Sequence, residues 1–272
     1  MKRQPDVAGR LLVEADEVEV WLRAAALMAV PYDTQRGVHM QSDAFTHHEE
    51  WDFANTPADK YPLLLHYPYF DIYRKQVIKQ ADLVMALHLR GDAFTLEEKI
   101  ADFAYYEART VRDSSLSAAA QAVVAAETGH LELAYDYWGE AALADLHNLH
   151  KNSGYGLHIA SLAGAWTVAV AGFGGLRDHD GELSFAPRLP ERLRRLRFRV
   201  AFRGRCLCVT VEQEKATYRL SDGEPLDIRH HGRQVTVGHD DLVLEVPPAP
   251  KVKPVRQPAG KAPHRRSRPE SD

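Results

Sequence analysis

Residues 79–117 read KQADLVMALHLRGDAFTLEEKIADFAYYEARTVRDSSLS, and this stretch decides the fold of the chain. Apolar residues recur at helical spacing over residues 72–87, and Gly91 then closes the predicted helix. Thr95 and Glu98 form a capping-box pattern, which predicts that a second helix starts directly afterwards. Because the connection between the two helices is short, we expect them to be antiparallel neighbours in an all-helical layer.

The helical signal continues on both sides of this stretch. Further helices are predicted over residues 15–30, 115–129, 131–146 and 157–170. Residues 32–68, in contrast, show no period and are dense in prolines, aromatics and histidines. A connection of this length is either a functional loop or an ordered loop that caps the core.

The pattern changes after the glycine-rich run at residues 172–175. Short alternating runs follow, separated by turn dipeptides such as Arg203-Gly204. The runs cover residues 183–185, 196–202, 207–211, 216–220, 226–228, 235–237 and 242–246. They predict an antiparallel sheet or sandwich of about seven strands. Residues 248–272 form a proline-rich, basic tail, which we expect to be disordered and solvated rather than bound to nucleic acid.

The composition is ordinary for a globular protein. Hydrophobic residues make up 45%, charged residues 26%, and the net charge is -4, so nothing points to a nucleic-acid partner. The apolar run at residues 157–173 is interrupted by His158 and by glycines, which argues against a membrane span. The N-terminus has no sustained apolar core, so we expect no signal peptide and a cytoplasmic location.

No metal site is expected. Cys206 and Cys208 point to the same face of a predicted strand, where they seldom form a disulfide, and two thiols are too few for a zinc site. Residues 47–50 read HHEE, but adjacent histidines cannot easily bind one ion.

Residue types that bind sugars gather in the opening stretch. Lys79 and Gln80 are adjacent in the predicted helix, and a pair of this kind is usually part of a solvated surface. Glu107 follows Tyr105 and Tyr106, whose rings could stack on a sugar or could belong to the core. A cation, an amide, a carboxylate and aromatic rings together can hold a sugar.

Hydroxyls and a histidine could hold an anion. Ser114 and Ser115 follow Asp113 at the start of an alanine-rich helix, where they could serve as an N-cap or as an anion site. His158 could donate a hydrogen bond to an anion or be a core histidine with its partners satisfied.

Taken together and in order, these segments resemble the C-terminal half of glycoside hydrolase family 65, which includes maltose, trehalose and kojibiose phosphorylases. The resemblance covers residues 16–246. It is carried by residues 31–33 (PYD), 61–64 (YPLL), 79–82 (KQAD), 103–107 (FAYYE), 113–117 (DSSLS), 156–161 (GLHIAS), 172–177 (GFGGLR) and 183–190 (LSFAPRLP).

The resemblance implies an α+β protein of several domains. Residues 1–175 would be the C-terminal half of an α/α barrel of six helical hairpins, residues 176–247 a β-sheet domain, and residues 248–272 the disordered tail. It implies that Lys79 and Gln80 bind the transferred glucosyl unit with help from Glu107. It also implies that Ser114, Ser115 and His158 bind phosphate.

The implied reaction is phosphorolysis of an α-glucosyl disaccharide to β-glucose 1-phosphate, with phosphate as co-substrate and no cofactor. An inverting hydrolase needs a carboxylate base to activate water, whereas phosphate is already anionic and needs an anion site instead. Hydrolysis is an alternative, with Asp113 as the nearest base. A non-catalytic carbohydrate-binding or assembly module is another.

One departure from the family pattern matters. The family's general-acid glutamate and a sugar-binding Trp-Asp pair lie in upstream segments that do not occur here, and the predicted helices supply about half of a barrel. General acid catalysis is typically worth about 10²- to 10⁴-fold in rate. We therefore expect residues 1–272 alone to be inactive, as a split or truncated gene product that either complements an N-terminal polypeptide or is a remnant; self-association with a second copy is an alternative.

Overall fold

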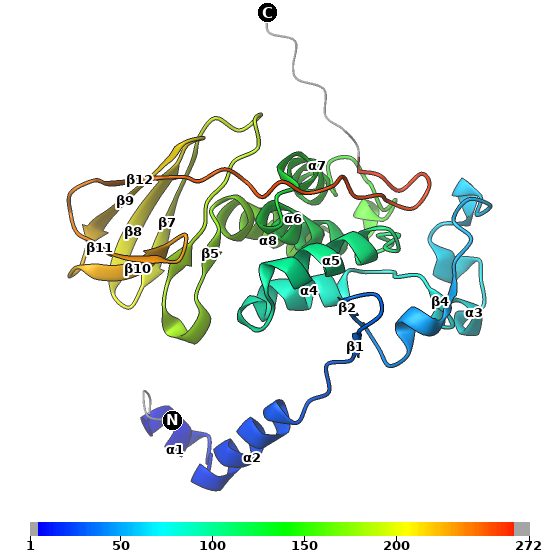
Figure 1. Ribbon diagram of the computed structural model, residues 1–272, viewed down its shortest axis with the longest axis horizontal. Coiled ribbons are helices and arrows are strands. Elements are labelled where there is room, and N and C mark those ends of the chain that lie inside the picture. The colour runs from blue at the N-terminus through cyan, green and yellow to red at the C-terminus, as the bar shows by residue number, and fades with distance from the viewer. Residues whose placement is uncertain (1–4, 264–272) are drawn as a thin grey trace, which may run out of the picture.

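The computed structural model describes residues 5–263, which combine a layer of helices with two four-stranded, mostly antiparallel sheets (Figure 1). The helices occupy the middle of the molecule, and the sheets pack on one side of them. Across residues 5–263, no helix is both long and apolar enough to span a lipid bilayer.

The first two helices form an arm that stands away from the rest of the molecule. They are α1 (Pro5–Arg10) and α2 (Ala15–Ala26), and an extended segment joins them to the body (Figure 1). Their apolar side chains stay uncovered: Trp21 is 54% exposed and Leu22 68%. The predicted helix over residues 15–30 is confirmed, although it stops before the extended segment that leads to Pro31, a residue that disfavours helical backbone before it.

Residues 32–78 are an ordered connection with little regular structure. They contain β1 (Tyr32–Asp33), β2 (Val38–His39), β3 (Glu49–Glu50), α3 (Tyr69–Tyr73), β4 (Lys75–Gln76) and short 3₁₀ turns at Phe45–His47, Ala58–Lys60 and Leu63–Leu65. The segment has a small hydrophobic cluster of its own, in which Leu63, Ile72 and Val77 pack with Val111. This cluster explains how a long connection without hydrophobic periodicity can still hold one conformation.

The prediction of a single helix over residues 72–87 is wrong. Gln76 is buried, and its amide donates hydrogen bonds to two backbone carbonyls of the preceding loop at 2.6 and 3.2 Å. Ile78 then forms a parallel bridge with Thr110. Because these tertiary partners satisfy the backbone and side chains in an extended form, the helix α4 (Asp82–Leu89) begins only afterwards.

The helical layer consists of α4, α5 (Leu96–Glu107), α6 (Ser117–Glu127), α7 (Leu131–Ala142) and α8 (Ile159–Thr167), which continues as a π-helix over Val168–Phe173. Helix α6 lies at the centre and is buried from Ser117 to Ala126. Its alanines let neighbouring helices approach closely, because a Cβ atom on Gly164 of α8 would lie 2.6 Å from that of Ala119.

The predicted start of α5 is confirmed. The Thr95 backbone N–H donates to Glu98 at 2.8 Å, and the Glu98 backbone N–H donates to the Thr95 hydroxyl at 3.2 Å. This reciprocal pair satisfies two of the N–H groups that every helix leaves free at its N-terminus. The beginning of the helix is thus fixed by local sequence.

The strands from β5 onward form two sheets that pack against each other. One sheet has the order β11 (Arg233–Val237), β10 (Leu226–His230), β6 (Ser184–Phe185), β5 (Leu176–Arg177), and the other β12 (Leu242–Glu245), β9 (Lys215–Asp222), β8 (Arg205–Val211), β7 (Leu196–Phe202). The Tyr218 hydroxyl of one sheet lies 2.8 Å from His230 Nδ1 of the other. All seven alternating runs that the sequence predicts appear as strands, and β5 is an additional one.

The junction between helices and sheets depends on glycine. Gly175 has a φ of +61°, and a Cβ atom there would overlap the backbone of Ala186. Phe173, just before this turn, is fully buried in the core cluster that spans the helices and both sheets. The glycine-rich run therefore brings the sheets directly onto the helical layer.

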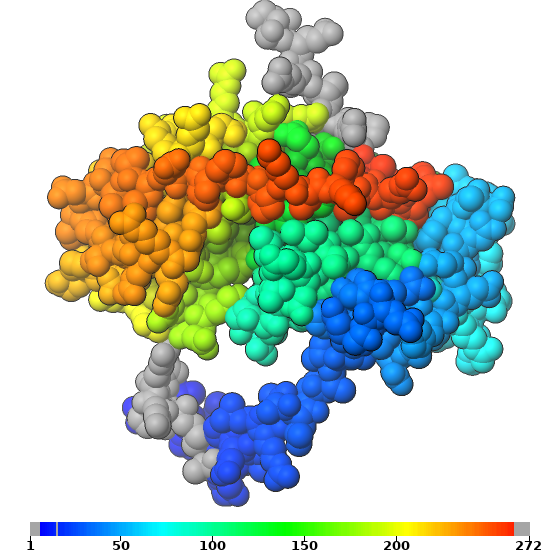
Figure 2. All heavy atoms as spheres, in the orientation of Figure 1, coloured from blue at the N-terminus to red at the C-terminus, as the bar shows by residue number. Residues whose placement is uncertain are grey.

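Residues 247–263, which we call the C-terminal strap, differ from the predicted disordered tail. After β12 they leave the sheets and cross the helical layer to the side where the helices meet the long connection (Figures 1 and 2). Val255 packs against the core, and Gly129, with a φ of +98°, leaves room for the Pro250 carbonyl, which would lie 2.5 Å from a Cβ there. The remainder of the predicted tail, residues 264–272, lies outside the described residues.

Candidate functional site

The structure brings three of the predicted site residues together. Ser114, Ser115 and His158 line one open pocket with a volume of about 550 Å³. The rest of its wall is formed by Tyr61, Pro62, Val111, Arg112, Asp113, Glu140, Leu149, His150, Lys151, Asn152, Gly260 and Lys261. The long connection, the α5–α6 turn, the segment before α8 and the strap all contribute.

The serines sit in the turn that leads into α6. The N-cap position of this helix is Leu116, whose apolar side chain cannot accept a hydrogen bond from the first backbone N–H groups. The Ser117 hydroxyl is buried and has no hydrogen-bond partner within residues 5–263. Asp113 does not cap the helix, since its carboxylate accepts from the Leu63 backbone N–H at 2.8 Å. Hydroxyls beside an uncapped helix N-terminus are suited to binding an anion.

His158 lines the same pocket as the serines and is held by Asp145. The Asp145 carboxylate lies 2.5 Å from His158 Nδ1 and also accepts from the His158 backbone N–H at 2.8 Å. The hydrogen bond from His158 lowers the pKa of Asp145. A carboxylate on Nδ1 favours a proton there and leaves Nε2 to interact with a ligand. The prediction that His158 lies within a helix is wrong by one residue, since α8 begins at Ile159.

Both carboxylates that line this pocket are ion-paired. Asp113 lies 3.1 Å from Lys261 Nζ, and Glu140 lies 3.1 Å from Arg112 Nε. The side chains of Asp113 and Arg112 are only 4% and 6% exposed. With these charges neutralised, the pocket does not repel an anion, and neither carboxylate is unpaired as a catalytic base would be.

Glu107 does not line the pocket. It is 1% exposed at the end of α5 and accepts hydrogen bonds from Gln121 at 2.6 Å, from Gln257 of the strap at 2.8 Å and from the Tyr137 hydroxyl. Burial raises the pKa of Glu107, against the opposing effect of the hydrogen bonds. Tyr137 also accepts from Arg112 at 3.2 Å, so Glu107 supports the pocket wall from behind.

Lys79 and Gln80 also lie outside the pocket, in the bend between the Ile78 bridge and α4 rather than in a helix. Lys79 is exposed, and Gln80 donates to Asp82 at 2.9 Å. The bridge from Ile78 to Thr110 is parallel, so both segments leave it in the same direction. This places Lys79 and Gln80 on the same side of the bridge as the turn that carries the serines.

Several residues that line this pocket, or that hold a lining residue as Asp145 does, were not predicted. Arg112 and Asp145 carried no signal beyond their charge, because their partners are distant in sequence. Lys261 was hidden by the composition of the tail, which is typical of disorder. Tyr61 belongs to one of the motifs, and its ring lies 3.7 Å from Lys261 Nζ.

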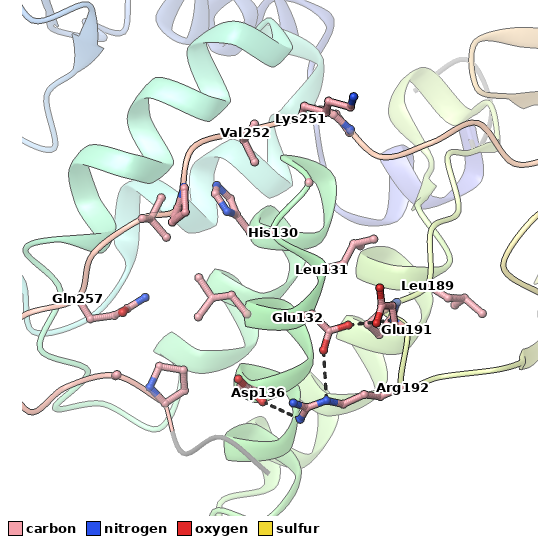
Figure 3. Close-up of a pocket in the computed structure, with 18 of the residues that line it drawn as sticks. His130, Leu131, Glu132, Asp136, Leu189, Glu191, Arg192, Lys251, Val252 and Gln257 are labelled. Carbon is pink, nitrogen blue, oxygen red and sulfur yellow. Dashed lines mark hydrogen bonds and ion pairs between the residues drawn. The ribbon is translucent and has the colours of Figure 1, made fainter. Parts of the chain in front are cut away.

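A second, larger pocket of about 890 Å³ opens between the strap and the start of α7 (Figure 3). Arg192 there lies 3.3 Å from Glu132 and 3.6 Å from Asp136. Figure 3 shows the strap with Val252 at the top of the view and Gln257 at its left, and Glu132, Asp136 and Arg192 toward the lower right. None of the predicted site residues lines this pocket.

Comparisons with known proteins agree on one family. Residues 1–167 match the model of the glycosyl hydrolase family 65 central catalytic domain, and residues 176–237 match the model of the C-terminal domain of the same family.

Individual relatives are much longer than this chain. It is 50% identical over 266 residues to an uncharacterized glycosyl hydrolase of Mycobacterium leprae (strain TN), covering 96% of this chain and 33% of that protein. It is 39% identical over 245 residues to the alpha,alpha-trehalose phosphorylase of Geobacillus stearothermophilus, covering 88% of this chain and 32% of that enzyme. The chain thus spans about a third of the length of the curated relatives it matches.

A solved structure is similar in fold. It is a putative kojibiose phosphorylase from the human microbiome, which superposes with a TM-score of 0.76 at 26% identity, covering 89% of this chain and 32% of that protein.

Proposed function

This chain belongs to glycosyl hydrolase family 65, and we propose that it provides the glucose- and phosphate-binding part of an inverting α-glucosyl disaccharide phosphorylase. The observation that carries the proposal is the pocket in which Ser114, Ser115 and His158 meet while the neighbouring carboxylates are ion-paired. In this role the pocket binds inorganic phosphate, which attacks the anomeric carbon as the glycosidic bond breaks; the products are β-glucose 1-phosphate and the second sugar, whose oxygen is protonated by the general acid.

The charges in the pocket favour phosphorolysis over hydrolysis. A hydrolase needs a carboxylate that accepts a proton from water. Asp113 and Glu140 are the carboxylates in the wall, and each is paired with a cation. Each carboxylate is therefore engaged with a cation instead of being open to a water molecule. Phosphate needs no base and gains from the hydroxyls and the histidine.

The glucosyl unit would be held next to the phosphate. We assign Lys79 and Gln80 to this contact, because the parallel bridge directs them to the same side as the serine turn. Glu107 would assist indirectly, through Tyr137 and Arg112, since its own oxygens are engaged and buried.

Uncovered apolar helix faces support association with more helices. On α2, α3 and α8 the side chains of Leu22, Phe70 and Trp166 are 68%, 70% and 62% exposed. Patches of this kind mark interaction surfaces. We propose that further barrel helices cover them and supply the general acid, whether those helices belong to the same polypeptide, to a second one or to another copy.

Phosphate binding by residues 1–272 tests the proposal directly. Isothermal titration with inorganic phosphate should give a measurable affinity. The double variant Ser114→Ala/Ser115→Ala should weaken it by at least about tenfold, because each lost hydrogen bond to a charged ligand costs about 1.5 kcal/mol or more. Ser221→Ala, an exposed serine of β9, is the matched control and should bind as the parent does.

Turnover provides the second arm. Residues 1–272 alone should release no glucose 1-phosphate from trehalose, maltose or kojibiose, whereas activity should appear when polypeptide carrying the general acid is added. Robust turnover by residues 1–272 alone would contradict the assignment. Reducing-sugar release that does not depend on phosphate would favour hydrolysis instead.

A further inference from the structure

The C-terminal strap reaches the proposed phosphate pocket although it lies outside both family matches, which end at residues 167 and 237. Gly260 and Lys261 form part of the pocket wall together with Ser114, Ser115 and His158. A segment that leaves the sheet domain after β12 therefore takes part in a site built on the helical layer (Figure 1).

Specific contacts seat the strap along its length. The Pro250 carbonyl fits against Gly129, where a side chain would collide, and Val255 packs against the core. Gln257 donates to the buried Glu107 at 2.8 Å. Figure 3 shows the strap with Val252 and Gln257 passing over the start of α7. These contacts lie upstream of Lys261 and fix the path of the chain into the pocket.

The end of the strap presents Lys261 to the pocket. A turn closed by the Lys261 backbone N–H and the Pro258 carbonyl, at 2.9 Å, orients the residue. Its own carbonyl accepts a hydrogen bond from Arg112. Lys261 Nζ lies 3.1 Å from Asp113 Oδ1 and 3.7 Å from the centre of the Tyr61 ring. Both the backbone and the side chain of Lys261 are thus held at the wall.

We propose that Lys261, carried by the strap, is an anion-binding residue of this pocket. An ammonium group has three N–H donors, so Nζ can bond to Asp113 and still donate to an oxyanion beside Ser114 and Ser115. It also neutralises Asp113, whose carboxylate would otherwise repel the ligand at short range. The ligand class is a tetrahedral oxyanion, either inorganic phosphate or the phosphate group of a sugar phosphate. The inference rests on the proposed function of the pocket.

Titration of the full chain with inorganic phosphate and, separately, with β-glucose 1-phosphate tests this role. Lys261→Met should weaken binding of one or both ligands by about tenfold or more, as expected for a lost hydrogen bond between charged groups. Lys261→Arg should keep most of the affinity. Lys253→Met removes an exposed cation of the same strap and should bind as the parent does.

Two truncations separate the strap from the residues beyond it. A chain that ends at residue 247 should lose affinity to the same extent as Lys261→Met, whereas a chain that ends at residue 263 should not. Far-ultraviolet circular dichroism and a thermal melt would verify that each variant is folded before titration.

The double variant Asp113→Asn/Lys261→Met tests the neutralising role. Removing the carboxylate should restore part of the affinity that Lys261→Met loses. A double variant that binds as weakly as Lys261→Met would contradict neutralisation.

The outcomes distinguish this inference from the proposed function. If the parent chain binds phosphate and Lys261→Met binds each ligand as tightly as the parent does, Lys261 is not part of the site. The assignment of Ser114, Ser115 and His158 then stands. If the parent chain binds neither ligand, the pocket is not a phosphate site and both proposals are overturned.

Discussion

A glutamate lies near each end of helix α5, the partly buried Glu127 of α6 and the fully buried Glu107, and the two are held in opposite ways. Glu127 of α6 meets the start of α5 through Lys99, at 2.7 Å, and meets β5 through Arg177, at 2.8 Å. Glu107, at the other end of α5, is held by Tyr137, Gln121 and Gln257, which are all neutral donors. The two cations lower the pKa of Glu127 despite its burial, whereas burial raises the pKa of Glu107.

The two sets of partners distinguish a purely structural contact, at Glu127, from a contact that supports the candidate site, at Glu107. Glu127 joins the helical layer to the sheets through full ionic contacts. Glu107 joins α5, α6, α7 and the strap through neutral donors, so that Arg112 pairs with Glu140 in the pocket wall. A carboxyl held by neutral groups keeps its neighbours in place without drawing on the cation that neutralises Glu140.

Replacing Glu127 should have the largest effect. In Glu127→Gln the side chains of Lys99 and Arg177, 6% and 12% exposed, lose the carboxylate with which each forms an ion pair and stay buried. Removing one partner of a buried ion pair typically costs about 3 kcal/mol or more of unfolding free energy. Urea denaturation measures this, and Glu97→Gln, an exposed glutamate of α5, should leave the stability unchanged. An equally small effect for both would show that Glu127 contributes no net stabilisation.

Replacing Glu107 should cost less, about 1–2 kcal/mol. In Glu107→Gln an N–H₂ group replaces one carboxylate oxygen and therefore points at a hydrogen-bond donor. No buried cation loses its ion-pair partner, however. The same urea titration measures the change. A loss as large as that of Glu127→Gln would remove the contrast between the two glutamates.

Removing the Tyr137 hydroxyl should have a smaller effect still, about 1 kcal/mol. Tyr137→Phe deletes a donor to Glu107 and an acceptor for Arg112, so the pKa of Glu107 should rise further. Tyr155→Phe, in which the parent ring is 96% exposed, is the matched control. Unchanged stability in Tyr137→Phe would mean that the hydroxyl does not support the pocket wall.

The pH dependence should have opposite signs at the two glutamates and is the subtlest effect. The raised pKa of Glu107 favours its protonated form in the folded state, so its contribution falls as pH rises from the usual value of 4.5 through the folded pKa. The lowered pKa of Glu127 gives a contribution that is complete above 4.5 and is lost as pH falls through the folded pKa.

Urea denaturation of the parent and of the two Gln variants from pH 3.5 to 8 would separate these contributions. The stability difference between parent and Glu107→Gln should shift against the parent as pH rises, and the difference for Glu127→Gln should shift against the parent as pH falls. Curves that change in the same direction would contradict the assignment of opposite pKa shifts.

Regular elements that depend on local pattern were largely predictable. The strands of both sheets alternate apolar and polar residues and are joined by short turns, and in the Arg203-Gly204 turn both residues have positive φ, as a tight hairpin requires. Thr95 and Glu98 mark the start of α5 because a capping box needs only neighbours in sequence. The motifs were also sufficient to indicate the family.

Elements that depend on distant partners were not predictable. The period over residues 72–87 indicates a helix, yet the buried amide of Gln76 and the bridge at Ile78 hold the backbone extended. The strap has the composition of a disordered tail, yet Val255 and Gln257 find partners on the helical layer. In both places the observed conformation is stabilised by tertiary contacts that composition and periodicity do not encode.

By itself, then, the sequence determined the two-part architecture, the positions of its strands and most helices, and the residue types of the proposed anion site, because these follow from patterns a few residues long. Only the tertiary structure decided that Ser114, Ser115 and His158 share a pocket, that Glu107 is buried behind it and that Lys261 completes its wall. The physical reason is distance along the chain: the Asp113–Lys261 and Glu107–Gln257 contacts join residues about 150 positions apart, and only folding brings such partners within hydrogen-bonding reach.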